Sequence, residues 1–363
     1  MKKKTYPDFF TIITLSMIIF TLIFPWKTAS YCKDALVLCG ESLIPSIFTF
    51  TVLAKILTHF SACGMFSKKI ENFFSRLFNL PPSLIPSCIL GLFCSSPSGA
   101  VAAACVYEKK LCTKEQAERA SVISDNCSAA FIISIGSMVT GSYFLSLLLF
   151  ISELLSALIV YFFLFRGKKE EFINPHFHSE KQSSISRILC ESITSTADIA
   201  IRICAYVLFF STTGKIITDC IAYFLNDNGL STILRGLTLS FFEMTSGINY
   251  LKWLGGYEAV IILSSAISFC GLSVMFQVTD VLNEKGLSSR LFVLSRLYTA
   301  LLSPLLTLFF LLILPENVAI MTSNVTYKSS GITVGDIISL LTVTLLFIIG
   351  GIFIAFLDKK HKK

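Results

Sequence analysis

Two short polar segments that interrupt apolar sequence hold the residues with the clearest capacity for chemistry. One is residues 124–128, with the sequence SDNCS, and the other is residues 241–247, with the sequence FFEMTSG. A carboxylate at membrane depth costs at least about 2.5 kcal/mol, so each one needs a reason. Beside unwound backbone carbonyls it can bind a cation or carry a proton, and we expect Asp125 and Glu243 to couple an ion or a proton. The alternative is that each carboxylate caps a half-helix.

Hydroxylated and small residues accompany these carboxylates. Residues 91–100 read GLFCSSPSGA, so a Ser-Gly pair follows an aromatic stretch here as it does in residues 241–247. Such turns could start half-helices, whose N-terminal N–H groups carry partial positive charge and bind anions. The residues that we expect to bind substrate are therefore the polar and small positions of these turns and interrupted segments: Ser95, Ser96, Ser98, Gly99, Asn126, Thr245, Ser246, Gly247, Ser273 and Gln277.

No pattern of an enzyme or a metal site accompanies them. The HExxH and GxGxxG signatures are absent, and the only histidine that could act at membrane depth, His59, lacks a partner motif. None of the four histidines is spaced with cysteine as a zinc site requires, and no pair among the 12 cysteines has CxxC spacing. We expect no catalytic residues, no metal and no cofactor, and we expect the cysteines to act as small hydrophobes.

The composition indicates what positions these residues. Of 363 residues, 54% are apolar and 15% are charged, and the mean hydropathy is +0.74. A soluble protein needs about 25% charged residues to cover its surface, so the composition predicts one all-α polytopic membrane domain. The net charge of +7 then reflects cytoplasmic loops and not a nucleic-acid surface.

Ten apolar stretches come close to the roughly 20 residues that a membrane-spanning helix needs. We favour a transmembrane helix over a signal peptide for the first stretch, because the sequence after it is also membrane-embedded. The stretches are residues 9–25, 43–66, 84–106, 120–140, 143–165, 193–217, 230–254, 259–282, 291–314 and 337–357.

The basic residues test how these stretches cross. If all of them cross, the basic clusters at 109–119 and 166–169 fall outside the cell, against the rule that basic loops are cytoplasmic. If 84–106 and 230–254 are re-entrant hairpins, every basic cluster falls inside, including the one at 285–296. The sequence therefore predicts about eight transmembrane helices, two hairpins that enter from opposite sides, and cytoplasmic N- and C-termini.

The two halves of the chain also match each other. Glu41 lies 58 positions before Gly99, and Glu191 lies 56 positions before Gly247. These spacings suggest an inverted repeat, which in transporters places the substrate site between the repeats. A rival alignment of residues 93–94 with 269–270 pairs a hairpin with a full span. The predicted regions are an N-terminal helix (1–32), a first repeat (33–165), a cytoplasmic linker (166–190), a second repeat (191–314), and an outer loop, last helix and basic tail (315–363).

Other charged residues within apolar stretches have plainer interpretations. Asp198 and Arg202 lie four positions apart, so they can pair on one face of a helix. Lys55 either faces a cavity or extends its amine to the membrane surface. Glu153 is expected to pack against a neighbouring helix, and Arg235 to lie near the membrane surface.

Several of these motifs, in this order, resemble a known family. The residues are SSPSGA at 95–100, EQAER at 115–119, the break at Asp125-Asn126, FEMTSG at 242–247 and SFCGLSVMFQ at 268–277. Together they resemble the sporulation integral membrane protein YlbJ family, which carries the nucleoside-recognition or Gate domain. The likeness covers roughly residues 35–314. Two positions depart from it: Ser95-Ser96 replace the usual Gly-Tyr, and Ala129-Ala130 follow the first break where a proline is common.

The resemblance implies a multi-pass protein of endospore-forming bacteria that moves a small anionic solute such as dipicolinate across a spore membrane. Its partners would be membrane lipid, the solute and other spore membrane proteins. Two alternatives stay open, a nucleoside-type transporter and a non-transporting structural component of a spore membrane complex.

Overall fold

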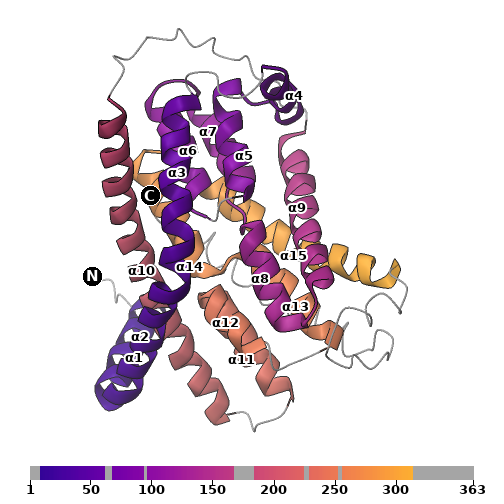
Figure 1. Cartoon of the computed structure of the whole chain (residues 1–363). Helices are drawn as coiled ribbons and strands as arrows, with labels where there is room; N and C mark the ends of the chain where they lie inside the picture. Colours follow the sequence, from indigo (N-terminus) through magenta and orange to yellow (C-terminus); the bar gives the residue numbers. More distant parts are fainter. Residues whose placement is uncertain are drawn as a thin grey trace, which may run out of the picture.

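The computed structural model describes residues 9–61, 68–93, 96–166, 184–224, 229–251 and 256–313, and all regular structure in these ranges is helical. The predicted all-α class is thus confirmed (Figure 1). A π-helical turn (Cys39–Leu43) and a 3-10 turn (Pro82–Leu84) accompany the α-helices. The α-helices are α1 (Phe9–Ile23), α2 (Pro25–Leu38), α3 (Ile44–Ser61), α4 (Lys68–Phe78), α5 (Ile85–Phe93), α6 (Ser98–Glu108), α7 (Lys114–Ser124), α8 (Ala129–Thr140), α9 (Tyr143–Phe165), α10 (Ile185–Phe224), α11 (Gly229–Phe242), α12 (Met244–Leu251), α13 (Gly256–Phe269), α14 (Gly271–Glu284) and α15 (Arg290–Ile313).

Five helical segments in the described part of the chain are long and apolar enough to cross a membrane. A sixth is possible if the bent pair Thr14–Ile23 and Pro25–Glu41, which turns by 106°, counts as one span. The chain is therefore an integral membrane protein, while eight crossings and two re-entrant hairpins stay a prediction. The predicted stretch at 337–357 lies outside the described residues. The five spans are Lys114–Thr140, Tyr143–Phe165, Ile185–Tyr223, Ala259–Glu284 and Arg290–Ile313.

The breaks within these spans lie where the polar residues predicted them. One span stops at Ser124 and resumes at Ala129, and another stops at Phe269 and resumes at Gly271. Cys270 and Gly271 both have positive φ, of 67° and 74°, which ends α13 abruptly. Both predicted hairpins also contain a break, between Phe93 and Ser98 and at Glu243.

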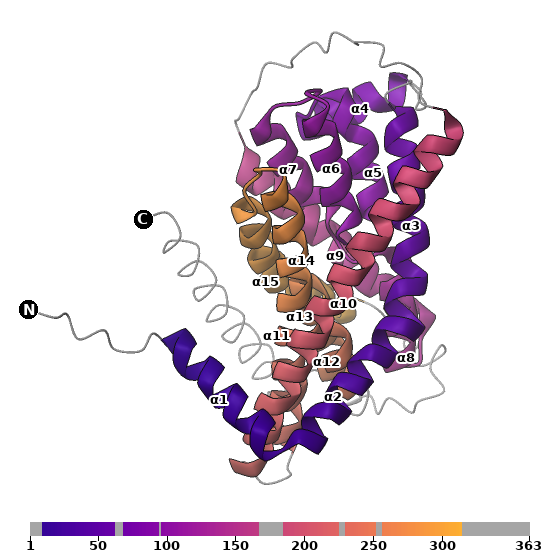
Figure 2. The same cartoon turned by 90° about the vertical axis from the view of Figure 1, so that its left-hand side faces the viewer.

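The hairpin helices are short. α5 and α6 have 9 and 11 residues, and α11 and α12 have 14 and 8. At about 1.5 Å per residue, none reaches across a hydrocarbon core of about 30 Å. The α5–α6 pair lies at one end of the bundle and the α11–α12 pair at the other (Figures 1 and 2).

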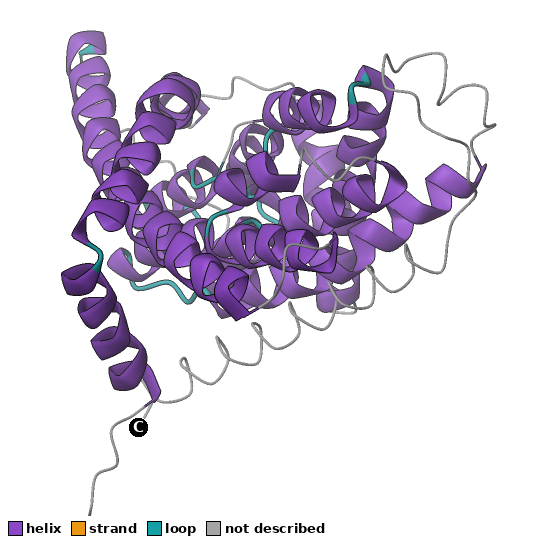
Figure 3. Ribbon diagram, turned by 90° about the horizontal axis from the view of Figure 1, so that it is seen from below, coloured by secondary structure: helices purple, strands orange, loops and turns teal. Residues whose placement is uncertain are grey.

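The same order of elements recurs in both halves of the chain. A long helical segment, a hairpin, a broken span and a closing span follow one another as α2–α3, α5–α6, α7–α8 and α9, and again as α10, α11–α12, α13–α14 and α15. This is the order that an inverted repeat would give. Figure 3 shows that several of the loops, drawn in teal, lie among the helices.

Candidate functional site

The first break is held by the α5–α6 hairpin. A Cβ added to Gly91 in α5 would lie 2.0 Å from the carbonyl oxygen of Ser124, and one added to Gly99 in α6 would lie 2.3 Å from it. Contacts this close exclude any side chain at either position. Two glycines thus let both hairpin helices close around the last residue of α7, and Gly99, predicted to bind substrate, packs against Ser124.

Asp125, directly after Ser124, is fully buried at 0% exposure. Neither carboxylate oxygen has a hydrogen-bond partner of normal geometry among the described residues. The backbone amide of Ala100, in the first turn of α6, is the donor that lies near it. Asn126 donates from Nδ2 to the carbonyl of Ile123 at 2.7 Å, while its Oδ1 also lacks a partner there. The first break therefore gathers unsatisfied oxygen acceptors in a buried site.

Glu243 has a different environment. Its Oε1 accepts from the backbone N–H of Thr245 at 3.0 Å, and its Oε2 accepts from that of Ser246 at 2.6 Å. These are capping bonds, so the capping alternative describes this carboxylate as it stands. The Ser246 hydroxyl bonds that of Ser211 in α10 at 2.9 Å. The first-turn N–H groups of α12 are thus occupied by a protein carboxylate.

A glycine also permits the close packing of the two helices in the second hairpin. A Cβ on Gly247 would lie 2.1 Å from Oγ and 2.2 Å from the backbone nitrogen of Ser240 in α11. Gly271, at the second break, approaches the turn of this hairpin, with its added Cβ 3.0 Å from the nitrogen of Met244. The second hairpin therefore contacts the second break as the first hairpin contacts the first.

Contacts between sulfur atoms join the two breaks. The Sγ atoms of Cys127 and Cys270 lie 3.8 Å apart, and Cys127 Sγ lies 3.8 Å from the Sδ of Met244. All three residues are buried. The broken spans of the two halves of the chain are thus in direct contact, and these cysteines pack as the small hydrophobes that the sequence predicted.

A buried ion pair lies beside this contact. Arg296 in α15 and Glu153 in α9 approach to 3.4 Å with side chains 0% and 2% exposed. The hydroxyl of Ser268 donates to Glu153, and Arg296 donates to the carbonyl of Val122 at 3.5 Å. Glu153 packs against neighbouring helices as expected. Arg296 lies inside the bundle, where it pairs with Glu153. It therefore does not belong to the cytoplasmic basic cluster at 285–296 to which the charge pattern assigned it.

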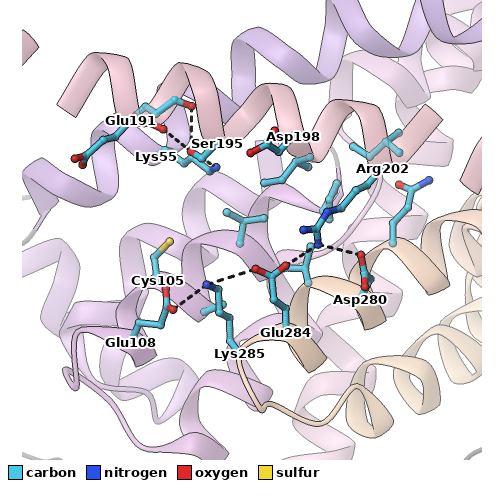
Figure 4. Close-up of a pocket in the computed structure, with 18 of the residues that line it drawn as sticks. Lys55, Cys105, Glu108, Glu191, Ser195, Asp198, Arg202, Asp280, Glu284 and Lys285 are labelled. Carbon is cyan, nitrogen blue, oxygen red and sulfur yellow. Dashed lines mark hydrogen bonds and ion pairs between the residues drawn. The ribbon is translucent and has the colours of Figure 1, made fainter. Parts of the chain in front are cut away.

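A chamber of about 410 Å³ opens between α3, α6, α10 and α14 (Figure 4). It follows α6 along its length, from Pro97 to Glu108, and reaches Gln277 in α14. Of the predicted substrate-binding residues, Gln277 lines this chamber, and its Nε2 donates to the Ser273 hydroxyl at 3.1 Å. Ser96 and Ser98 flank Pro97 and are buried, and Ser95 lies outside the described residues.

A chain of ion pairs, here called the ionic ladder, links three walls of the chamber. Lys285 contacts Glu108 at 2.8 Å and Glu284 at 3.7 Å. Arg202 contacts Glu284 at 2.6 Å and Asp280 at 3.4 Å. The ladder therefore joins α6, α14 and α10 (Figure 4). The hydrogen bond from Lys285 to Glu108 raises the pKa of that lysine above its ordinary value.

Two sequence predictions about charge are decided here. The four-residue spacing predicted that Arg202 pairs with Asp198, but the pairs found for Arg202 lie across the helix interface, on α14, because Asp280 and Glu284 face it there. Lys55 faces the chamber, and its amine donates to the Ser195 hydroxyl at 2.7 Å. The sequence did not reveal the ladder, since each of its contacts joins residues remote in sequence or sits at a helix end.

Comparison with known proteins agrees with the motifs. Residues 41–169 match the Gate family model, described as nucleoside recognition. Over 326 residues, the chain is 22% identical to the sporulation integral membrane protein YlbJ of Bacillus subtilis (strain 168), which covers 80% of this chain and 78% of that protein. No solved structure matches. The resemblance predicted from the motifs is thus confirmed, and the matched segment contains the first hairpin, the first break and α9.

Proposed function

We propose that this protein is a transporter of spore formation that moves a small solute across a membrane. The proposal rests on the contact of the two broken spans at Cys127 and Cys270. A chamber also runs along the hairpin helix α6. Non-helical backbone at membrane depth is tolerated where protein or a water-filled cavity covers it, and secondary transporters place substrate and ion sites at such breaks. The role in sporulation is carried over from the similar YlbJ protein.

For the substrate we propose a small anionic solute such as dipicolinate, which the family resemblance suggests. Lys55, Arg202 and Lys285 bring positive charge to three walls of the chamber. An anion could exchange with the carboxylates that these cations now face. The predicted serine and glycine positions at the hairpin turns would then bind the solute deeper in the protein, near Ser98 and Ser246.

A nucleoside-type solute is the second candidate, and two observations favour it. The matched family model is described as nucleoside recognition. The chamber is also lined by acids and bases in nearly equal number, which suits a neutral polar molecule. The acids are Glu108, Glu191, Asp198, Asp280 and Glu284, and the bases are Lys55, Lys109, Arg202 and Lys285.

For the coupling ion we propose a site at Asp125. Asp125, Glu153 and Arg296 are all buried, and Arg296 is the base that acts on both acids, so one negative charge of these three groups is left uncompensated. A buried charge without a partner is costly, so one proton or one monovalent cation would neutralise the group. Glu243 is proposed as the matching carboxyl of the second repeat, where coupling requires that the α12 cap opens.

Uptake into proteoliposomes that contain the purified full-length protein tests this function. Radiolabelled dipicolinate and radiolabelled uridine are supplied in parallel, each under an imposed proton gradient, an imposed sodium gradient or none. We expect saturable uptake of one solute that depends on one gradient, and loss of that dependence in Asp125→Asn. If neither solute enters above the level of protein-free vesicles, the transport proposal fails for both solute classes and the structural role in a spore membrane complex is favoured.

The predicted orientation has its own test. Lys110 is exposed in the loop between α6 and α7. In a background without cysteine, Lys110→Cys should react with a membrane-impermeant maleimide only from the cytoplasmic side. Reaction from the outer side would refute the re-entrant hairpins, because their assumption is what places this loop inside.

A further inference from the structure

Helix α4 connects α3 to the first hairpin and lies across the end of the bundle, near one end of α9 (Figures 1 and 2). Its sequence, KKIENFFSRLF, is strongly amphipathic. Phe78 is buried, and its ring lies 5.6 Å from that of Tyr161 and 6.3 Å from that of Phe162. One edge of the apolar face is therefore fixed against α9.

The other edge of the same apolar face is uncovered. Ile70, Phe73 and Leu77 are 45%, 62% and 42% exposed. Their spacing of three and four residues places them on one stripe of the helix. Three large exposed apolar side chains on an eleven-residue helix are not explained by contacts within the described part of the chain.

Basic residues border this stripe. At 100° per residue, Lys69 and Arg76 lie on a common face beside Phe73, and both are exposed. Apolar residues on one face with Lys and Arg at its edge are typical of helices that lie in the membrane interface, where the cations meet anionic headgroups.

The stripe also continues onto a surface that faces lipid. Phe162 and Phe163, in the last turn of the spanning helix α9, are exposed, and Phe162 stacks against Phe78 of α4. The end of a span lies at the level of the headgroups, so α4 contacts α9 at that level.

We propose that α4 is an interfacial helix that binds anionic lipid of the bilayer leaflet next to it. Ile70, Phe73 and Leu77 enter the boundary between headgroups and acyl chains, while Lys69 and Arg76 contact the headgroup phosphates. The helix would hold the start of the first hairpin at the membrane surface. This lipid site does not depend on the proposed transport.

Tryptophan fluorescence of the full-length protein in vesicles tests the proposal. Trp26 and Trp253, the two native tryptophans, are replaced by Phe, and Phe73→Trp provides the probe. Asn72→Trp, exposed on the opposite face of α4, is the matched control. We expect lipids with brominated acyl chains to quench the Phe73→Trp protein and aqueous iodide to quench the Asn72→Trp protein.

The charges are tested by comparing brominated phosphatidylglycerol with brominated phosphatidylcholine. We expect the anionic lipid to quench the Phe73→Trp protein more strongly, and Lys69→Gln or Arg76→Gln to lower this preference by about fivefold each. Lys110→Gln, an exposed basic residue outside α4, should leave it unchanged. Quenching of the Phe73→Trp protein by iodide, or by neither reagent, would overturn the interfacial position. Equal quenching by the two lipids would overturn the anionic recognition.

Discussion

The two halves of this protein use the same scaffold around chemically different breaks. In each half, a glycine-lined hairpin closes on itself or on the end of a broken span, and the two broken spans meet at Cys127 and Cys270. The first break contains an ionisable residue, Asp125, which has no hydrogen-bond partner of normal geometry among the described residues. The second break, at Cys270-Gly271, contains no carboxylate. The carboxylate of the second half instead lies in the hairpin turn, at Glu243, where two backbone N–H groups bond it.

This difference separates two roles that sequence alone gives equally to both carboxylates. A capped carboxylate stabilises the helix that it caps, and its negative charge is balanced by the helix dipole. A buried carboxylate without donors destabilises the fold, and such groups gather at functional sites. We therefore propose a structural role for Glu243 and ion chemistry first for Asp125.

The largest loss of stability is expected at the ion pair between α9 and α15, the closing spans of the two halves. Arg296→Met leaves Glu153 as an unpaired buried charge, which should cost about 3–5 kcal/mol of unfolding free energy. Unfolding in detergent, followed by circular dichroism against temperature, measures the loss. The double variant Glu153→Leu with Arg296→Met should recover most of it, since no charge is then left unpaired.

Arg290→Met, at the exposed start of the same helix, is the matched control and should change little. If Arg296→Met were no more destabilising than Arg290→Met, the pair would not hold the two halves together.

Substitution of the hairpin glycines should have the next largest effect on stability. Gly99→Ala and Gly247→Ala each place a Cβ within 2.3 Å of a neighbouring residue, so the hairpin must shift, at a cost of up to about 3 kcal/mol and with loss of transport. Gly40→Ala, whose added Cβ meets nothing within 4 Å, is the control. Thermal unfolding and vesicle uptake are measured together. A strong effect in only one half would break the equivalence of the two hairpins.

The local features of this fold could be predicted from the sequence. Gly, Pro, Ser and Asp within apolar stretches directly marked both hairpin turns and both span breaks, because each of these residues disfavours continued helix or caps a new one. The all-helical membrane class followed from composition. Helix α2 was not predicted, because it lies mostly between the apolar stretches 9–25 and 43–66, and a π-helical turn at Cys39–Leu43 joins it to α3.

Long-range pairing could not be predicted. Arg296 lies in a run of basic residues that suggested a cytoplasmic loop, and nothing local indicates that it turns inward to Glu153, 143 positions away. The same holds for Arg202, whose nearest acid in sequence is Asp198 but whose ion pairs lie on α14. Partner choice depends on how helices pack, and one sequence does not contain that information locally.

A smaller effect should separate the two carboxylates directly. Glu243→Gln weakens two capping bonds and should cost about 1 kcal/mol, whereas Asp125→Asn removes an unsatisfied charge and should cost nothing or stabilise. Proton or sodium dependence of uptake should vanish in Asp125→Asn. If uptake by the Glu243→Gln protein still depends on the proton or sodium gradient, coupling is restricted to the first half of the chain. If this dependence is lost, coupling involves both halves.

The reverse result for stability, with Asp125→Asn the more destabilised of the two, would contradict the contrast between an unsatisfied and a capped carboxylate.

The smallest effect is expected at the ionic ladder, the polar link between the first hairpin and the second broken span. Lys285 and Glu108 are both partly exposed, so solvent screens their attraction and the pair contributes less than about 1 kcal/mol. Because Glu108 raises the pKa of Lys285, the contribution is complete below the unfolded pKa of about 10.4 and is lost as pH rises through the higher folded value. An amine-directed reagent should therefore modify Lys285 at a lower pH in the Glu108→Gln protein than in the protein without this substitution. Mass spectrometry of the peptide that contains Lys285 measures the modification, and exposed Lys110 in the same sample serves as the reference. An unchanged pH profile for Lys285 would show that Glu108 does not hold this lysine, and the ladder would then lack its contact between the two halves.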